Sequence, residues 1–230
     1  MNKFNLVRRF FLKIYYIIVY FLKNIYFFIL PSKKFVFNGK ELKYFRHMYN
    51  RAYENERTVE VSIAKWFLNS QIKGVDILEV GDVLNNYGVN FKQDVLDKYE
   101  ISSKIINSDV VDFVPEKKYK TIISISTLEH VGWDEVEQDS QKIPRALENL
   151  KNNCLLLGGS ILVTLPIGYN KFFDEYLSTN PRIFSEKYFF KRISADNLWE
   201  QVGYEKVAGI RFGEPFNNAN AIFIGVVKKD

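Results

Sequence analysis

The sequence predicts an α/β domain with a mostly parallel sheet and helices on both faces. Apolar runs rich in β-branched residues recur along the 230-residue chain, and helix-length segments separate some of them. Strands that alternate with helices are typical of parallel sheets buried on both faces. With 47% hydrophobic and 26% charged residues, the chain can bury a core. Its length suits one domain with an appendage.

The predicted elements begin with a helix over residues 50–70, in which apolar side chains recur at helical spacing. Residues 141–156 form a second predicted helix, and the aromatic cluster at 184–190 is expected in the core. Apolar runs predict six strands. They are VDILEV (75–80), DVLD (94–97), KIINSDV (104–110), TIISISTL (121–128), SILVTLP (160–166) and AIFIGVV (221–227).

The basic charge is confined to the N-terminal part of the chain. Residues 1–50 carry ten Lys and Arg against one acid, whereas residues 51–230 carry twenty-two against twenty-six. Nucleic-acid binders usually carry positive charge on the folded domain, so no nucleic-acid partner is expected. The division predicts an attachment segment over residues 1–48 and a mildly acidic domain over residues 49–230.

The segment FFLKIYYIIVYFLKNIYFFIL, residues 10–30, is long enough to span a bilayer. Its basic and tyrosine residues recur at steps of four and three, which places them on one stripe of a helix: Arg9, Lys13, Tyr16, Tyr20 and Lys23. This pattern favours a helix lying in the membrane interface through residues 4–30, on the cytoplasmic side. A single span and burial against the domain or a partner are the alternatives.

Few residues are suited to disulfides or metal sites. Cys154 is the only cysteine, which excludes an internal disulfide and suits a reducing compartment. His47 and His130 are the only histidines. No metal centre is therefore expected.

Acidic and polar residues follow successive predicted strands. Glu79 and Gly81 end the first run, Asp97 the second, Asp109 the third and His130 the fourth. The carboxyl ends of parallel strands meet at one edge of the sheet, where ligands bind. Carboxylates there could accept hydrogen bonds from ribose hydroxyls and from an adenine amino group. The pattern therefore suits a nucleoside.

Four blocks of sequence resemble the class I S-adenosylmethionine-dependent methyltransferases. They are ILEVG (77–81), INSDVVDF (106–113), YKTIISISTLEHVG (119–132) and LLLGGSILVTLPIG (155–168), within about residues 50–230. The chain also resembles the short methyltransferase-like proteins of surface-polysaccharide biosynthesis. The resemblance implies a Rossmann-like sheet, S-adenosylmethionine as cofactor, and methyl transfer to a hydroxyl or related nucleophile of a small or glycan-linked acceptor.

The same resemblance implies roles for the cofactor residues. Glu79 and Gly81 would form the turn near the methionine and ribose portions, and Asp97 would take the ribose position. Asp109 and Val110 would flank adenine. The alternative for Glu79 is a capped turn at the sheet edge.

His130 would lie near the transferred methyl group and could deprotonate an acceptor hydroxyl. The alternative is that its ring orders the following loop, where Asp134 and Glu135 are expected to begin a helix. Three residues after the fifth strand are candidates for acceptor binding: Tyr169, Asn170 and Asp174.

The loop after the first strand departs from the family pattern. Gly81 is followed by Asp82, Val83, Leu84 and Asn85, so only the first of the usual small residues is present. Larger side chains restrict close approach of the backbone to a ligand. A catalytically inactive scaffold in a membrane-associated biosynthetic complex is therefore the second hypothesis. A nicotinamide-dependent oxidoreductase is disfavoured because no GxGxxG follows the strand.

Overall fold

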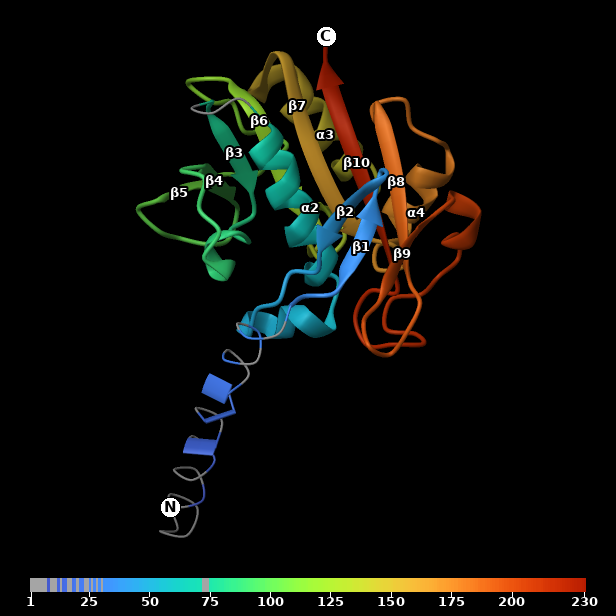
Figure 1. Cartoon of the computed structure of the whole chain (residues 1–230). Helices are drawn as coiled ribbons and strands as arrows, with labels where there is room; N and C mark the ends of the chain where they lie inside the picture. Colours follow the sequence, from blue (N-terminus) through green and yellow to red (C-terminus); the bar gives the residue numbers. More distant parts are fainter. Residues whose placement is uncertain are drawn as a thin grey trace.

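The computed structural model describes residues 31–71 and 75–230, together with isolated positions between residues 8 and 29. Its centre is a sheet with strand order β5-β4-β3-β6-β7-β10-β8-β9 (Figure 1). The strands are β3 (Ile77–Val80), β4 (Asp94–Asp97), β5 (Ile105–Asn107), β6 (Tyr119–Ile125), β7 (Leu155–Pro166), β8 (Glu186–Arg192), β9 (Trp199–Val202) and β10 (Ala221–Lys229).

The sheet is mostly parallel. Strands β5, β4, β3, β6 and β7 pair in parallel, and β10 lies antiparallel between β7 and β8. Strand β8 therefore runs in the direction of β7, and β9 pairs antiparallel with it. The parallel strands follow the order of Rossmann-like sheets, with β10 inserted before the last of them. The predicted Rossmann-like sheet is thus confirmed.

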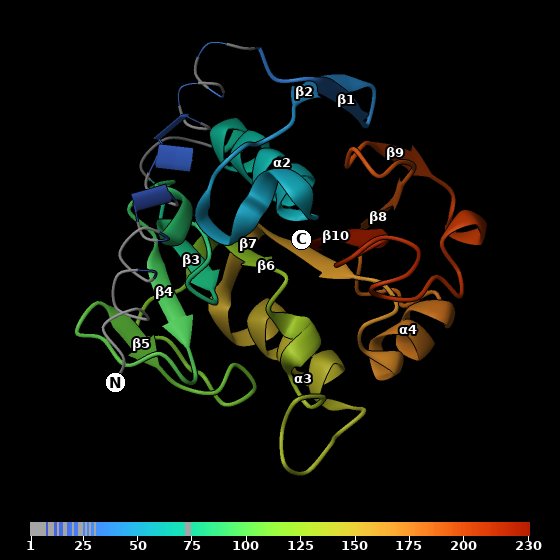
Figure 2. The ribbon, with the colours of Figure 1, turned by 90° about the horizontal axis from the view of Figure 1, so that it is seen from below.

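Helices cover both faces of this sheet (Figure 2). Helix α2 (Arg57–Ser70) lies on one face, and α3 (Lys142–Asn149) and α4 (Lys171–Ser178) lie on the other. A π-helical turn, η4 (Leu150–Cys154), continues α3 directly into β7. The short helical turns are η1 (Tyr49–Glu54), η2 (Asn85–Tyr87), η3 (Leu128–His130) and η5 (Tyr204–Lys206). The two helices predicted from sequence are therefore present but shorter.

Each face has its own apolar core. On the α2 face, Val59, Ile63 and Phe67 recur at helical spacing and belong to the same buried cluster as Ile123 and Leu162 of the sheet. This spacing is why α2 forms against a sheet.

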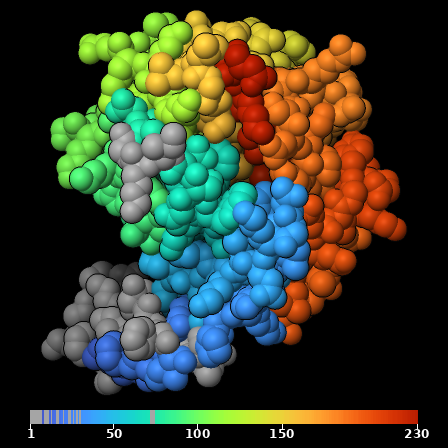
Figure 3. Space-filling model, turned by 45° about the horizontal axis from the view of Figure 1, so that its top comes forward, coloured from blue at the N-terminus to red at the C-terminus, as the bar shows by residue number. Residues whose placement is uncertain are grey.

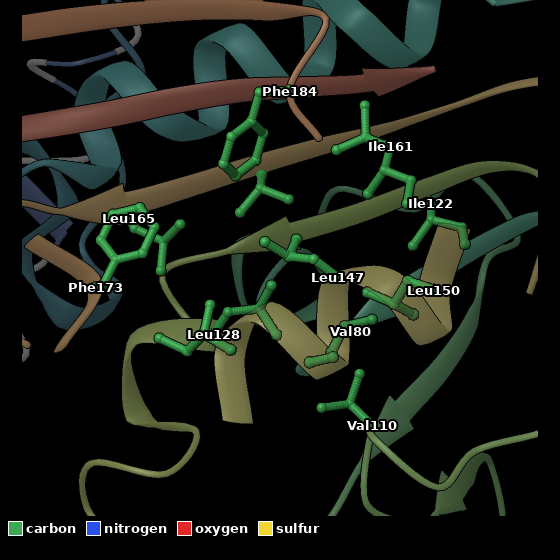
Figure 4. Close-up of a cluster of buried hydrophobic side chains, with 14 of the residues drawn as sticks. Val80, Val110, Ile122, Leu128, Leu147, Leu150, Ile161, Leu165, Phe173 and Phe184 are labelled. Carbon is green, nitrogen blue, oxygen red and sulfur yellow. The ribbon is translucent and has the colours of Figure 1, made fainter. Parts of the chain in front are cut away.

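On the opposite face, Leu147 of α3 and Leu150 of η4 belong to the cluster that contains Val80, Val110 and Leu128 (Figure 4). Val80 ends β3, and Val110 and Leu128 follow β5 and β6. Helix α3 therefore packs against the residues at the strand ends on this face of the sheet.

A hairpin of β1 (Lys34–Phe37) and β2 (Lys40–Lys43) extends the α2 face. Its turn residues Asn38 and Gly39 both have positive φ, as a two-residue type I′ turn requires. Phe35 and Phe37 are buried, and the Phe35 ring lies 5.8 Å from that of Phe190. Figure 3 shows the hairpin in blue beside α2 and the C-terminal strands. Residues 34–48 thus share a core with residues 49–230, although the sequence groups them with the N-terminal segment.

Most of the predicted membrane segment, residues 4–30, lies outside the described residues. The described positions between Arg8 and Ile29 have helical backbone, and most are exposed. Within the part of the chain that the structure describes, no helix combines the length and apolar character needed to cross a bilayer.

Candidate functional site

A cavity of about 320 Å³ opens at the carboxyl ends of β3, β4, β5 and β6. This is where ligands bind in sheets of this type, and the volume is within the usual range of roughly 300–1,000 Å³ for ligand pockets. The lining combines apolar and ionisable side chains. It is formed by Val80, Gly81, Leu96, Asp97, Lys98, Tyr99, Ser108, Asp109, Val110, Thr127, His130, Val131, Asp134 and Glu135.

Gly81 occupies a position that only glycine fits without strain. Its φ is +87°, and a Cβ added there would lie 2.3 Å from Oγ1 of Thr127. Its amide donates to the carbonyl oxygen of Leu96 at 2.8 Å, which ties the turn to the neighbouring strand. Gly81 is thus the one residue of the Gly81 loop, residues 81–84, that lines the cavity, and it does so with no side chain.

Glu79 lies behind this loop and is not part of the cavity lining. Its side chain is fully buried. Oε1 accepts from the amides of Val83 and Leu84 at 3.0 and 2.7 Å, and Oε2 accepts from Nε2 of Gln93 at 2.9 Å. Burial raises the pKa of Glu79 to about 7, although these hydrogen bonds lower it. Glu79 therefore holds the Gly81 loop in place, and a direct contact with a cofactor stays a prediction.

Asp97 lines the cavity at the end of β4, as its predicted role requires. Its Oδ1 accepts from the amides of Tyr99 and Glu100 at 2.8 and 2.9 Å. These two bonds fix the turn and orient the carboxylate. The residue can then present its second oxygen to hydroxyl groups.

Asp109 also lines the cavity, where it belongs to a network of four charged groups. Its Oδ2 is 2.8 Å from Nζ of Lys98 and 2.8 Å from Nζ of Lys142, and both lysines also bind Glu135. Burial opposes ionisation of Asp109, but the two lysines outweigh it and hold the pKa at about 2. Asp109 is therefore charged and paired with both lysines. That Asp109 and Val110 flank adenine stays a prediction.

His130 lies at the rim of the cavity, where it forms a cluster with Asp134 and Tyr169. Its Nδ1 is 2.5 Å from Oδ2 of Asp134, and the Tyr169 hydroxyl donates to the same carboxylate oxygen at 2.7 Å. The His130 side chain is 49% exposed. Burial opposes ionisation of Asp134, but the hydrogen bonds from His130 and Tyr169 lower its pKa. A charged carboxylate thus orients an accessible imidazole.

The other two predicted acceptor residues hold the turn between β7 and α4. Asn170 is buried, accepts from the amides of Phe172 and Phe173, and donates to the carbonyl oxygen of Glu129 at 2.7 Å. Both carboxylate oxygens of Asp174 accept from the amide of Gly168 at 3.1 and 3.2 Å. Tyr169 alone of the three contacts His130, and acceptor binding by any of them stays a prediction.

Behind the strand end of β6, helix α2 contributes a buried ionic cluster. Arg57 pairs with Glu60, and Ser126 donates its hydroxyl to Oε1 of Glu60 at 2.7 Å. These contacts hold Ser126 at a φ of +38°, which is uncommon for a residue with a side chain. Glu129 is also buried here, and burial raises its pKa well above the ordinary value. The buried contacts from helix α2 therefore hold the start of the turn that carries His130.

The local sequence pattern does not indicate several of the site residues. Asp134 was expected to begin a helix, but it forms the closing residue of a single turn in which its amide donates to the His130 carbonyl. The spacing of four between His130 and Asp134 is the signal that could have revealed the pair. Thr127, Lys98 and Lys142 had no comparable signal.

Comparison with known proteins identifies similar folds but no family. No family model matches the chain, and no curated protein sequence matches it. Among solved structures, it is similar to the N-methyltransferase NodS from Bradyrhizobium japonicum in complex with S-adenosyl-L-homocysteine. The identity is 14%, over 78% of this chain and 90% of that chain, with a TM-score of 0.49.

Two further solved structures are similar at the same level. A TehB-like methyltransferase from Corynebacterium glutamicum has 16% identity over 73% of this chain and 86% of that chain, with a TM-score of 0.44. An rRNA methylase from Streptococcus thermophilus has 10% identity over 74% and 97%, with a TM-score of 0.45. The function of this chain therefore rests on the chemistry of its site.

Proposed function

We propose that the protein is an S-adenosylmethionine-dependent methyltransferase acting on a hydroxyl or related nucleophile of a small or glycan-linked acceptor. The observation that carries this proposal is the position of His130. Oriented by Asp134, it lies at the rim of a cavity that also contains Gly81, Asp97 and Asp109. A base and a nucleoside-sized site are thus adjacent.

The cavity residues fit this cofactor. Gly81 lines the cavity with no side chain, and a Cβ there would meet Thr127. Asp97 is placed to accept hydrogen bonds from ribose hydroxyls, and Val80, Leu96 and Val110 supply apolar surface for a purine ring. The negative charges of Asp97 and Asp134 also suit a cofactor that carries a positive sulfur.

The protein's contribution to the reaction is positioning and proton removal. When bound, S-adenosylmethionine supplies a methyl group whose bond to sulfur breaks, with its electron pair staying on sulfur, as the acceptor oxygen forms the new bond. With Nδ1–H donating a hydrogen bond to Asp134, His130 keeps its lone pair on Nε2, which lies 3.7 Å from Oε1 of Glu129 and can accept the hydroxyl proton. Tyr169 donates to the same Asp134 oxygen and so helps to hold the carboxylate in place. The rest of the acceleration comes from holding the acceptor in line.

The test is to replace His130 by Ala and to measure turnover and cofactor affinity separately. Loss of a positioned base costs typically about 10²–10⁴-fold in rate, and the dissociation constant for S-adenosylhomocysteine should stay within about threefold. His47→Ala, the change at the other histidine, is the matched control and should keep full turnover. If His130→Ala retains turnover, the proposed role of the imidazole is wrong.

The segment before residue 31 is proposed to attach the protein to a membrane surface. Its net positive charge favours anionic headgroups, and most of its described apolar residues are exposed. The full chain should sediment with vesicles containing anionic lipid, and removal of residues 1–32 should release it. A full-length protein that stays in the supernatant would contradict this attachment.

A further inference from the structure

The N-terminal segment leaves the domain at its catalytic edge. Phe27, a described residue of the segment, has its carbonyl oxygen 2.8 Å from Nη2 of Arg46, and its ring centroid lies 5.1 Å from that of Tyr53. The Arg46 guanidinium also lies 5.2 Å from the centre of the Phe27 ring. The segment is thus joined to residues 46–53.

Residues 45–58 connect this junction to the site. The amide of Phe45 donates to the carbonyl oxygen of Thr58 at 2.8 Å, and Thr58 donates its hydroxyl back to Phe45 at 2.7 Å. The neighbouring Arg57 donates to the carbonyl oxygen of Ser126, directly after β6 and four residues before His130. Phe45 also packs edge to face on Tyr87, in the connection after β3.

The views agree with these contacts. Strand β10 ends at the top of Figure 1, so the carboxyl ends of the parallel strands, which run opposite to it, lie at the bottom. The described parts of the N-terminal segment, in blue, extend from the same end. A membrane that binds this segment would therefore lie on the side of the cavity mouth.

Five exposed apolar residues of the segment form a stripe on the side of the helix that faces away from its junction with the domain. With about 100° per residue, positions 18, 21, 22, 25 and 29 fall within roughly 100° of the helix circumference, and Phe27 lies roughly opposite them. Four of the stripe residues are more than half exposed: Ile18 at 51%, Phe21 at 64%, Leu22 at 57% and Ile29 at 68%. The lysines and arginines of residues 1–50 supply a matching positive charge.

We infer that the acceptor nucleophile is a hydroxyl in the headgroup of a membrane lipid, which reaches His130 along the bilayer surface. This inference rests on the proposed function. The stripe would enter an anionic bilayer and hold the catalytic edge against its headgroups. His130 and Asp134, with side chains 49% and 43% exposed, would then face that layer. A lipid-anchored acceptor also gains from confinement to the same surface as the enzyme, because its effective concentration rises.

The test uses the full-length protein and cofactor labelled on the methyl group. One reaction contains vesicles made from the total membrane lipids of the organism in which the protein naturally occurs. The other contains the water-soluble extract of the same organism. Two changes in the exposed stripe, Phe21→Asp and Ile29→Asp, form one variant. The matched control is Leu157→Asp, which places the same charge at a 72% exposed apolar position near the start of β7, at the opposite edge.

The label should enter the lipid phase. The stripe variant should lower that transfer more than tenfold while its affinity for S-adenosylhomocysteine is unchanged, and the Leu157 control should match the wild type. Label in the water-soluble fraction at equal rates in all variants would overturn the lipid acceptor. So would the absence of labelled lipid from a protein that binds S-adenosylhomocysteine. Failure to bind it at all would instead remove the proposed function.

Discussion

Replacing Glu79 tests whether this residue only holds the Gly81 loop in place or also contacts the cofactor. Its Oε1 accepts from two amides of the Gly81 loop, and its Oε2 accepts from Gln93. Glu79→Gln keeps the oxygen that faces Val83 and Leu84 but places an amino group against Gln93. Glu79→Ala removes all three acceptor contacts.

The two variants should differ strongly in stability. Glu79→Ala leaves three donors without a partner, and each buried unsatisfied group costs about 1–3 kcal/mol, so the loss should be at least about 3 kcal/mol. Glu79→Gln should lower the free energy of unfolding by about 1 kcal/mol near pH 5, because the hydrogen bond from Gln93 is lost. Cofactor affinity should fall more than about tenfold in the Ala variant, through loss of the loop, and less than about threefold in the Gln variant.

The pH dependence gives an independent check. Burial raises the pKa of Glu79 from 4.5 to about 7, so the folded state binds a proton more tightly than the unfolded state. Stability from this group is therefore greatest below pH 4.5 and is lost as pH rises towards 7, by up to about 3 kcal/mol at 1.36 kcal/mol per pH unit. The Gln variant has no such group. The free energy of unfolding of the Gln variant, relative to that of the wild type, should therefore rise by up to about 3 kcal/mol between pH 5 and pH 8.

Urea unfolding of both variants at several pH values, with calorimetric titration of S-adenosylhomocysteine, measures these quantities. A Gln variant that folds as well as wild type at pH 5 but binds the ligand more than tenfold more weakly would mean that Glu79 contacts the cofactor directly. A pH-independent difference between Gln and Glu would refute the raised pKa.

Three further predictions concern the strand ends and the core. Gly81→Ala should cost about 1–3 kcal/mol and weaken cofactor binding, because the new Cβ would meet Thr127 at a positive φ; thermal unfolding and titration measure both. Wild-type stability should fall as pH drops from about 4 to 2, because Asp109 has a lowered pKa; Lys142→Met should flatten this loss in acid unfolding. Phe223→Ala should cost about 3–5 kcal/mol in urea, because this core ring is fully buried.

The parallel sheet could be predicted because its strands are continuous apolar runs. The run ending at Val80 and the run ending at Ile125 are buried on both faces, which leaves a strong local pattern. Parallel strands end at the same edge of the sheet, so the residues that follow three of them line one cavity: Gly81, Asp97 and His130.

The missed elements have weak or ambiguous local patterns. Strand β8 reads EKYFFKR, and its aromatic residues suggested a core patch of no definite structure. The hairpin β1–β2 has an Asn38–Gly39 turn signal, but it directly follows the long apolar segment, so composition and charge assign both to one N-terminal part.

The sequence could not predict the charge network around Asp109 for a different reason. Lys142 and Asp109 are 33 residues apart, and their contact depends on how α3 packs under the strand ends. Nothing local in either segment indicates that partner. The orientation of Glu79 towards its own loop likewise depends on burial behind Gly81, which the sequence pattern alone does not specify.

The central claim is that these strand ends bind S-adenosylmethionine. Calorimetric titration of the full-length protein with S-adenosylmethionine and S-adenosylhomocysteine tests it most directly, with Asp97→Asn as the variant that weakens the ribose contact. We expect one site with a dissociation constant of roughly 1 mM or tighter, and at least about tenfold weaker binding in the variant. No heat of binding from either compound at millimolar concentration would contradict the account.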